Sequence, residues 1–104
     1  MKNESIEKLK ENREFKGIWI PKEIWFDDNL DAIEKCILAE IDSLDNENHC
    51  VASNNYFAHF IGCSESKVSK SISKLLDLGY IKQVHFDGRI RILSSNIKYS
   101  IKER

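Results

Sequence analysis

Three lysines stand at a spacing that suits phosphate binding. Lys67, Lys70 and Lys74 recur at intervals of three and four residues, so a helix would place them along one ridge. Small hydroxyl side chains, Ser66 and Ser73, would share the exposed face with them. Ammonium groups neutralise phosphates, and serine hydroxyls donate to phosphates or base edges, so the ridge is a candidate nucleic-acid contact. The alternative is a solvated helix face without a ligand.

The apolar residues around this ridge predict a helix over residues 65–78. Val68, Ile72 and Leu75 fall on the opposite side of the helix, where they would face a core, with Leu76 beside them. Ser64 is a favoured N-cap residue, and Gly79 closes the segment. The lysine ridge would therefore be held on the outside by a buried apolar stripe.

A second helix is predicted immediately before the first, over residues 54–61. Ser53 suits its N-cap and Gly62 its end, which leaves only residues 62–64 between the two helices, the short connection of a helix-turn-helix. Its predicted buried stripe is Tyr56, Phe57, Phe60 and Ile61. Asn54 and Asn55 open this helix, where they could hold a phosphate or simply cap the helix.

Beyond Gly79 the apolar period changes from 3.6 to 2, which predicts two strands around the turn Asp87-Gly88. A two-residue turn would mix polar and apolar residues on both faces. A three-residue loop pairs His85 with Arg89 and places the polar and apolar residues on opposite faces more cleanly, so we favour this loop. That register puts His85, Arg89 and Arg91 on one face, where they could contact a phosphate backbone, or form a solvated surface.

The chain before residue 53 contributes the remaining elements. Asp31 and Glu34 resemble a capping box at the start of a helix whose apolar face is Ile33, Ile37, Leu38, Ile41 and Leu44. The polar run 45–48 is expected to end that helix, and 49–52 to form one small strand. Pro21 is expected to open a helical turn, and the neighbouring Trp19 and Trp25 to pack in the core or at its edge. We expect an extension over 1–14, a domain over 15–93 and a tail over 94–104.

Composition sets the class of protein. The 104 residues carry a net charge of −1, and no apolar run is long enough for a membrane helix or a signal peptide, so we expect a soluble, cytoplasmic protein without a membrane partner. The charge is segregated: residues 27–62 hold one Lys against eight acids, whereas 63–93 hold six Lys/Arg against three. The acidic stretch should lie away from any DNA-binding face, as a solvated surface or a dock for a basic partner.

Enzymatic and metal chemistry are not expected. The four Gly and one Pro are few for active-site loops, and the chain has no nucleophile triad, paired-carboxylate motif or phosphate loop. Cys36, Cys50 and Cys63 lack the CxxC spacing of a zinc site and are interpreted as buried free thiols. We therefore expect no cofactor and no metal ion.

The order helix, short strand, helix, tight turn, helix, hairpin is that of a winged helix-turn-helix, an α+β, mainly α fold with a three-helix core and a C-terminal wing. Residues 17–93 resemble the N-terminal winged-helix domain of DnaD-type replication-initiation and replisome-organiser proteins of Gram-positive phages and plasmids. The resemblance lies in Ile20-Pro21, Ser53-Asn54, Phe57-Ala58, Gly62 with Ser64, and Leu75 followed by Leu78-Gly79-Tyr80-Ile81. It implies a role in replication, and a stand-alone DNA-binding or regulatory role is equally open.

We therefore expect a sequence-specific binder of double-stranded DNA, with helix 65–78 in the major groove and the wing on the backbone. The predicted DNA contacts are Asn54, Asn55, Ser64, Ser66, Lys67, Lys70, Ser73, Lys74, His85, Arg89 and Arg91. A homodimer would double the phosphate contacts, and its candidate contact is formed by Ile6, Leu9, Trp19 and Trp25. The alternative is a module that binds a replication or regulatory protein through its acidic and aromatic surfaces, without DNA.

Overall fold

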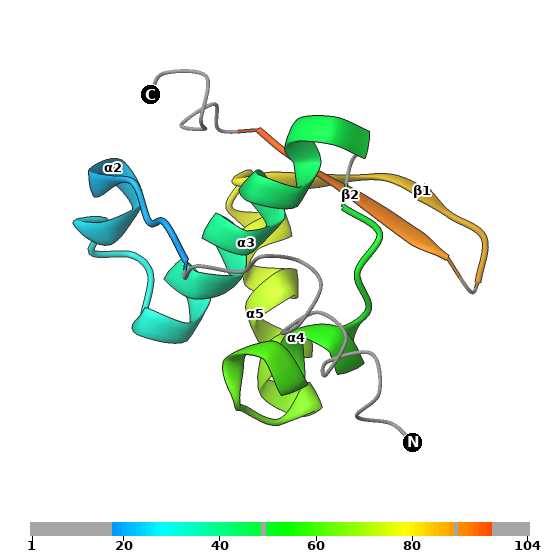
Figure 1. Cartoon of the computed structure of the whole chain (residues 1–104), viewed down its shortest axis with the longest axis horizontal. Helices are drawn as coiled ribbons and strands as arrows, with labels where there is room; N and C mark the ends of the chain where they lie inside the picture. Colours follow the sequence, from blue (N-terminus) through cyan, green and yellow to red (C-terminus); the bar gives the residue numbers. More distant parts are fainter. Residues whose placement is uncertain (1–17, 49, 89, 97–104) are drawn as a thin grey trace.

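The computed structural model describes residues 18–48, 50–88 and 90–96. Within them the elements are α2 (Lys22–Trp25), α3 (Ala32–Asn48), α4 (Asn54–Ile61), α5 (Glu65–Asp77), β1 (Ile81–Phe86) and β2 (Arg91–Ser95). The long helix α3 lies at the centre, with α2 at one side of the molecule and the hairpin projecting from the other (Figure 1). The fold is a winged helix-turn-helix, mainly helical, as the sequence predicts.

Side-chain caps start the three main helices where the sequence predicts them. At α3, Asp31 Oδ1 accepts from the Glu34 amide at 2.8 Å, and Glu34 Oε1 accepts from the Asp31 amide at 2.8 Å. Ser53 Oγ accepts from the Tyr56 amide at 3.1 Å to open α4. These bonds satisfy amides that have no partner within their helix, so the local sequence fixes each starting point.

The end of α3 differs from the prediction. The helix does not stop before the polar run 45–48 but continues through it to Asn48. This run contains no Gly or Pro to break a helix. Asp45 also gains partners from β2, because its Oδ2 accepts from Ser94 Oγ at 3.1 Å and from the Ser95 amide at 2.9 Å.

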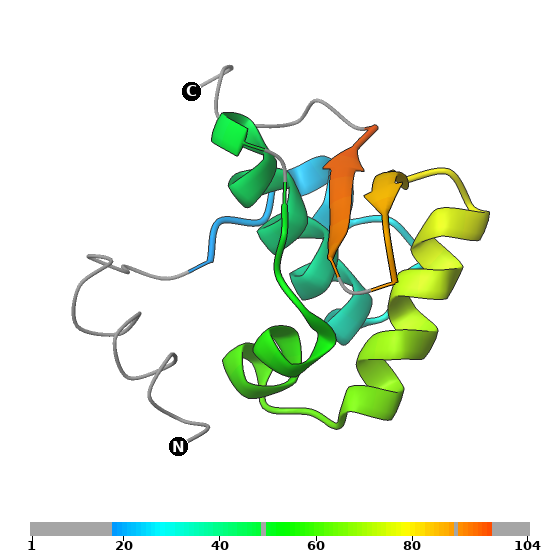
Figure 2. The same cartoon turned by 90° about the vertical axis from the view of Figure 1, so that its right-hand side faces the viewer.

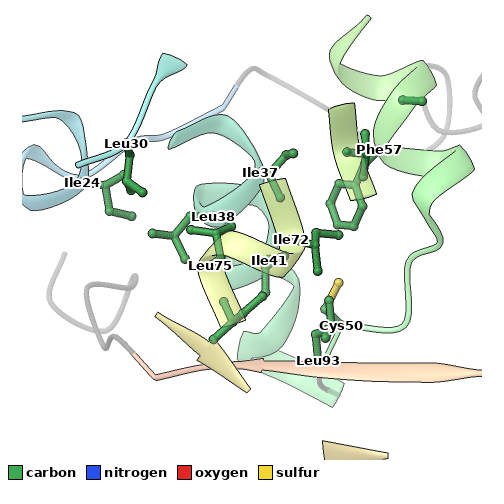
Figure 3. Close-up of a cluster of buried hydrophobic side chains, with 13 residues drawn as sticks. Ile24, Leu30, Ile37, Leu38, Ile41, Cys50, Phe57, Ile72, Leu75 and Leu93 are labelled. Carbon is green, nitrogen blue, oxygen red and sulfur yellow. The ribbon is translucent and has the colours of Figure 1, made fainter. Parts of the chain in front are cut away.

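One hydrophobic core joins all the elements (Figure 3). Residues of α3 form its middle, Phe57 of α4 lies at one end, and Ile24 of α2 with Leu30 lies at the other. The fully buried large side chains include Phe57, Ile24, Ile37, Leu38, Ile41, Leu75, Ile81, Leu93 and Val68. Of the stripe predicted on α4, only Phe57 is buried, while Tyr56 and Ile61 are half-buried at the edge of the core. Phe60 is half-buried and stacks on Tyr56.

The two tryptophans are not core residues, and that prediction was wrong. Trp19 is 56% exposed and Trp25 is 51% exposed, whereas their neighbour Ile24 is buried. The single turn of α2 presents one narrow face to the core, and Ile24 occupies it. Trp25 instead packs under Lys35, whose ammonium nitrogen stands 5.1 Å from the ring centroid.

The hairpin register also differs from both alternatives considered from the sequence. Phe86 pairs with Arg91 and His85 with Ile92, whereas the two predicted registers paired either Phe86 or His85 with Arg89. A bulge between Gln83 and His85 shifts the pairing. Because a bulge adds an unpaired residue, simple alternation cannot reveal the register.

Hydrogen bonds to Cys50 tie β2 to the helical body. The Cys50 amide donates to the Leu93 carbonyl at 2.9 Å, and the Leu93 amide donates back at 2.8 Å. The predicted strand over 49–52 is therefore reduced to one bridge at Cys50. This bridge makes β2 the inner strand of the hairpin and leaves β1 at the edge (Figure 2).

Candidate nucleic-acid interface

A three-residue turn sets the angle between α4 and α5. Gly62 has a φ of +89°, and its amide and that of Cys63 both donate to the Ala58 carbonyl, at 2.8 and 3.0 Å. This left-handed position strongly favours glycine. Ser64 then caps α5, with Oγ accepting from the Lys67 amide at 3.0 Å. Ser64 is thus a capping residue, and its contact with DNA stays a prediction.

Helix α5 buries one side and exposes the other. Val68, Ile72 and Leu75 are buried, as predicted, and Ser71 is buried with them. The opposite side exposes Ser66, Ser69, Lys70, Ser73 and Asp77. We call these five residues the outer face of α5. Ser69 was missing from the predicted set, although its spacing of four from Ser73 could have placed it there.

The three lysines of the ridge differ in their surroundings. Lys67 Nζ lies 2.8 Å from Asp31 Oδ2, and Lys74 Nζ lies 3.0 Å from Glu34 Oε1. Lys70 is exposed and has no ion-pair partner among the residues that the structure describes. The capping box of α3 thus binds two of the three ridge lysines, and within the described ranges Lys70 is the exposed lysine of the ridge without such a pair.

This arrangement corrects one expectation. The acidic stretch 27–62 was expected away from the DNA-binding face, but Asp31 and Glu34 bind two predicted DNA contacts, Lys67 and Lys74. The hydrogen bond to Asp31 raises the pKa of Lys67 despite its partial desolvation. Burial opposes ionisation of Asp31, but the bonds from Lys67 and the Glu34 amide outweigh it and lower its pKa. Both groups are therefore charged at neutral pH.

The wing is joined to α4 by an arginine. Arg91 Nη1 donates to Asn54 Oδ1 and Nη2 donates to the Ala52 carbonyl, each at 2.8 Å. The side chain is half-buried, and burial lowers its pKa. Arg91 was expected on an open wing face beside His85, so its tether to α4 is a correction. The tether also engages the amide oxygen of Asn54.

The other predicted wing contacts lie at the hairpin tip or outside the described residues. His85 is exposed, with Nε2 at 3.7 Å from Asp87 Oδ2. Arg89 falls outside the part of the chain that the structure describes. Phe86 and Ile90, on either side of the turn, expose about half of their surface. The described tip is thus more apolar than the sequence alone led us to expect.

A cleft of about 360 Å³ opens between the wing and the starts of α4 and α5. It is lined by Val51, Asn54, Asn55, Glu65, Phe86, Ile90 and Arg91, among others. Figure 2 shows the two strands of the wing with α5 to their right and α4 below them. Asn55 Nδ2 donates to Glu65 Oε2 at 3.0 Å across the cleft, which links the first turns of the two helices. Glu65 was not among the predicted site residues.

The cysteines show no metal-site geometry in the described part of the chain, where no group of three or more His, Cys, Asp and Glu side chains is gathered. Cys50 is buried, and burial raises the pKa of its thiol to about 11. Cys36 and Cys63 are half-buried rather than buried, which corrects part of the prediction. A thiol of such high pKa is a poor nucleophile at neutral pH.

The candidate dimer contact is described in part. Trp19, Trp25 and Phe26 are all exposed in the segment that precedes α3, whereas Ile6 and Leu9 lie outside the described residues. Within the described ranges, no helix has the length and apolar character required to cross a membrane.

Comparison with known proteins supports the fold and its general role. A family model described as a helix-turn-helix domain matches residues 28–81, more than half of the chain. The match runs from the entry of α3 through α5 to the first residue of β1. Neither the curated proteins nor the solved structures gave a significant match. Helix-turn-helix domains bind DNA in general. By this match, and by the geometry of α4, the turn and α5, the chain belongs to the helix-turn-helix domain family.

Proposed function

We propose that this protein binds double-stranded DNA in a sequence-specific manner, with α5 in the major groove and the wing against the backbone. The outer face of α5 carries this proposal. It is exposed along the helix and bears Lys70 among three serines, with Asp77 at its far end, so the helix backbone could approach the groove closely. A major groove about 12 Å wide admits such a helix. The cleft beside the wing would receive one edge of the groove.

The charges of α5 imply modest affinity for one copy. Asp31 and Glu34 partly neutralise Lys67 and Lys74, so Lys70 is the principal phosphate contact of this helix. The paired lysines keep 36% and 43% of their side chains exposed, so a phosphate could compete with the carboxylates for them. Each further phosphate contact raises both affinity and its dependence on salt.

A homodimer would double these contacts, and we propose that it forms through the surface around Trp19 and Trp25. Residues 19–26 expose two indoles to about half and Phe26 to 73%, which is much exposed aromatic area for a small domain. Burial of these rings would stabilise a dimer that reads a two-fold site. Sedimentation should then show a dimer at micromolar concentration, and a monomer for Trp25→Ala; a monomeric parent protein would exclude the dimer.

The biological setting that we propose is a phage- or plasmid-like replication or transcription-regulatory system. The motifs that resemble DnaD-type and replisome-organiser domains support it. Ser53-Asn54, Gly62 with Ser64, and Gly79-Tyr80-Ile81 occupy the start of α4, the turn and the exit from α5, which are the positions where that resemblance requires them.

The decisive experiment compares Lys70→Ala with Lys22→Ala in gel shifts over a series of salt concentrations. Both variants remove one exposed lysine, but Lys22 lies on α2, far from the wing (Figure 1). Lys70→Ala should weaken binding and reduce the slope of log affinity against log salt by about 0.9. Lys22→Ala should leave the slope unchanged. Equal slopes for Lys70→Ala and the parent would contradict the placement of α5 in the groove.

A second function is favoured by the ion pairs and the exposed rings together. A domain in which two of the three α5 lysines are ion-paired, and which exposes Trp19, Trp25 and Phe26, could bind a replication or regulatory protein without contacting DNA. It would show no gel shift even at low salt. Substitution of Trp25 would then abolish the protein contact, whereas Lys70→Ala would leave that contact intact.

A further inference from the structure

Glu65 is an acidic residue in a place where a DNA-binding surface should be positive. It is the first residue of α5, it is exposed, and it lines the cleft between the wing and the two helices. Its carboxylate would approach the phosphates that Lys70 is proposed to bind. A negative charge at that point opposes DNA binding unless it meets a hydrogen-bond donor on the DNA.

The structure holds this carboxylate in one orientation. Asn55 Nδ2 donates to Glu65 Oε2 at 3.0 Å, from the first turn of α4. A carboxylate has two oxygens and about four acceptor sites, so this bond leaves capacity for another donor. Phe86 and Ile90 of the wing line the same cleft, so apolar side chains stand on the wing side of this acceptor. A carboxylate that is positioned by one hydrogen bond beside apolar side chains is suited to discriminate between hydrogen-bond donors on DNA bases.

We propose that Glu65 reads a base pair in the major groove, by accepting a hydrogen bond from the exocyclic amine of cytosine. The first residues of a recognition helix are those that reach base edges. The inference rests on the proposed DNA binding and adds to it one specificity-determining residue, with Asn55 as its positioning residue.

The chemistry of the groove selects cytosine. Guanine and thymine present acceptors at O6, N7 and O4, which repel a carboxylate. Adenine offers an amine, but its N7 acceptor lies beside that amine and would face the second carboxylate oxygen. Cytosine offers N4–H₂ without an adjacent acceptor on the same base. A C·G pair is therefore the best partner for Glu65.

The test is selection of binding sites from random double-stranded DNA by the whole protein. The parent should select a motif with one position fixed as C·G. Glu65→Ala should lose at least about fivefold discrimination at that position and leave the others unchanged. It should also bind mixed-sequence DNA more tightly, because a negative charge is removed. Asn55→Ala should reduce discrimination at the same position.

Two further variants make the result specific. Glu23→Gln removes an exposed acid from α2, outside the proposed DNA-binding surface, and should leave the selected motif unchanged. Glu65→Gln preserves an acceptor for Asn55, so it keeps the link between the helices if Glu65→Ala fails to fold, as judged by thermal melting. Gln should shift the position from C·G towards A·T, because its amide pairs with the donor and acceptor of adenine.

The possible failures are separable. If the parent binds DNA and Glu65→Ala and Glu65→Gln both select the parent's motif with undiminished discrimination, Glu65 only links the helices and the inference is overturned, while DNA binding stands. The same conclusion follows if the parent binds DNA without any preferred sequence. If the parent does not bind DNA at low salt, both the proposed function and this inference are wrong.

Discussion

The two sides of α5 carry lysines in opposite situations. Towards α3, Lys67 and Lys74 bind the carboxylates that also cap that helix. On the outer face, Lys70 stands among serines with no ion-pair partner in the described residues. Helical spacing along a sequence therefore does not give the three lysines one function: two of them join two helices, and one is available to a ligand.

The largest expected effect tests the buried side of this helix. Ile72→Ala should lower the free energy of unfolding by about 2–5 kcal/mol, because Ile72 is only 4% exposed and truncation leaves a cavity. Urea denaturation measures the change. Lys70→Ala, two residues away, should change stability by less than about 0.5 kcal/mol. Similar losses in the two variants would mean that the assigned sides of α5 are wrong.

A smaller effect is expected where capping and ion pairing meet. Glu34→Ala removes the acceptor of both the Asp31 amide and Lys74 Nζ, and should cost about 1–2 kcal/mol of stability. It should also release Lys74, so DNA binding should become tighter and steeper in salt. Glu23→Ala, an exposed acid on α2, is the control for lost charge. A variant that loses stability without gaining DNA affinity would show that Lys74 does not face the DNA.

The smallest effect concerns Asp31, whose pKa is lowered in the folded protein. Because its pKa is lowered, ionised Asp31 stabilises the folded protein at pH values above 3.8, its ordinary pKa. This contribution to stability is lost as the pH falls through the pKa of Asp31 in the folded protein. Asp31→Asn retains a capping oxygen but lacks this titration. The parent should therefore be slightly more stable than the variant near neutral pH, and this difference in the free energy of unfolding should disappear in denaturation series taken below pH 3.8. A constant difference in the free energy of unfolding between parent and variant over this range would show that the ion pair of Asp31 with Lys67 contributes nothing to stability.

Signals within a few residues made much of the fold predictable. Ser53, Ser64 and the pair Asp31 and Glu34 mark helix starts because each cap bonds an amide three residues away. Gly62 marks the turn for the same local reason, since its φ is positive. These residues, with the apolar spacing of α5, were sufficient for the helix-turn-helix.

Contacts between residues distant in sequence explain why other predictions from the sequence were wrong. Lys67 and Lys74 meet acids 36 and 40 residues before them, and Arg91 meets Asn54 across 37 residues. No local pattern encodes such pairs, so the lysine ridge looked uniform and Arg91 looked exposed. The bulge near Val84 likewise arises from pairing with β2 and has no mark in the alternation of β1.

The tether formed by Arg91 has a consequence for the entropy of association. A two-stranded hairpin alone is marginally stable in water. Here Arg91 fastens β2 to the start of α4, and the bridge between Cys50 and Leu93 fastens it again. The strands of the wing are thus ordered when the protein folds, before any partner arrives. The free energy of the contacts they make is therefore not reduced by a further loss of conformational freedom in the strands.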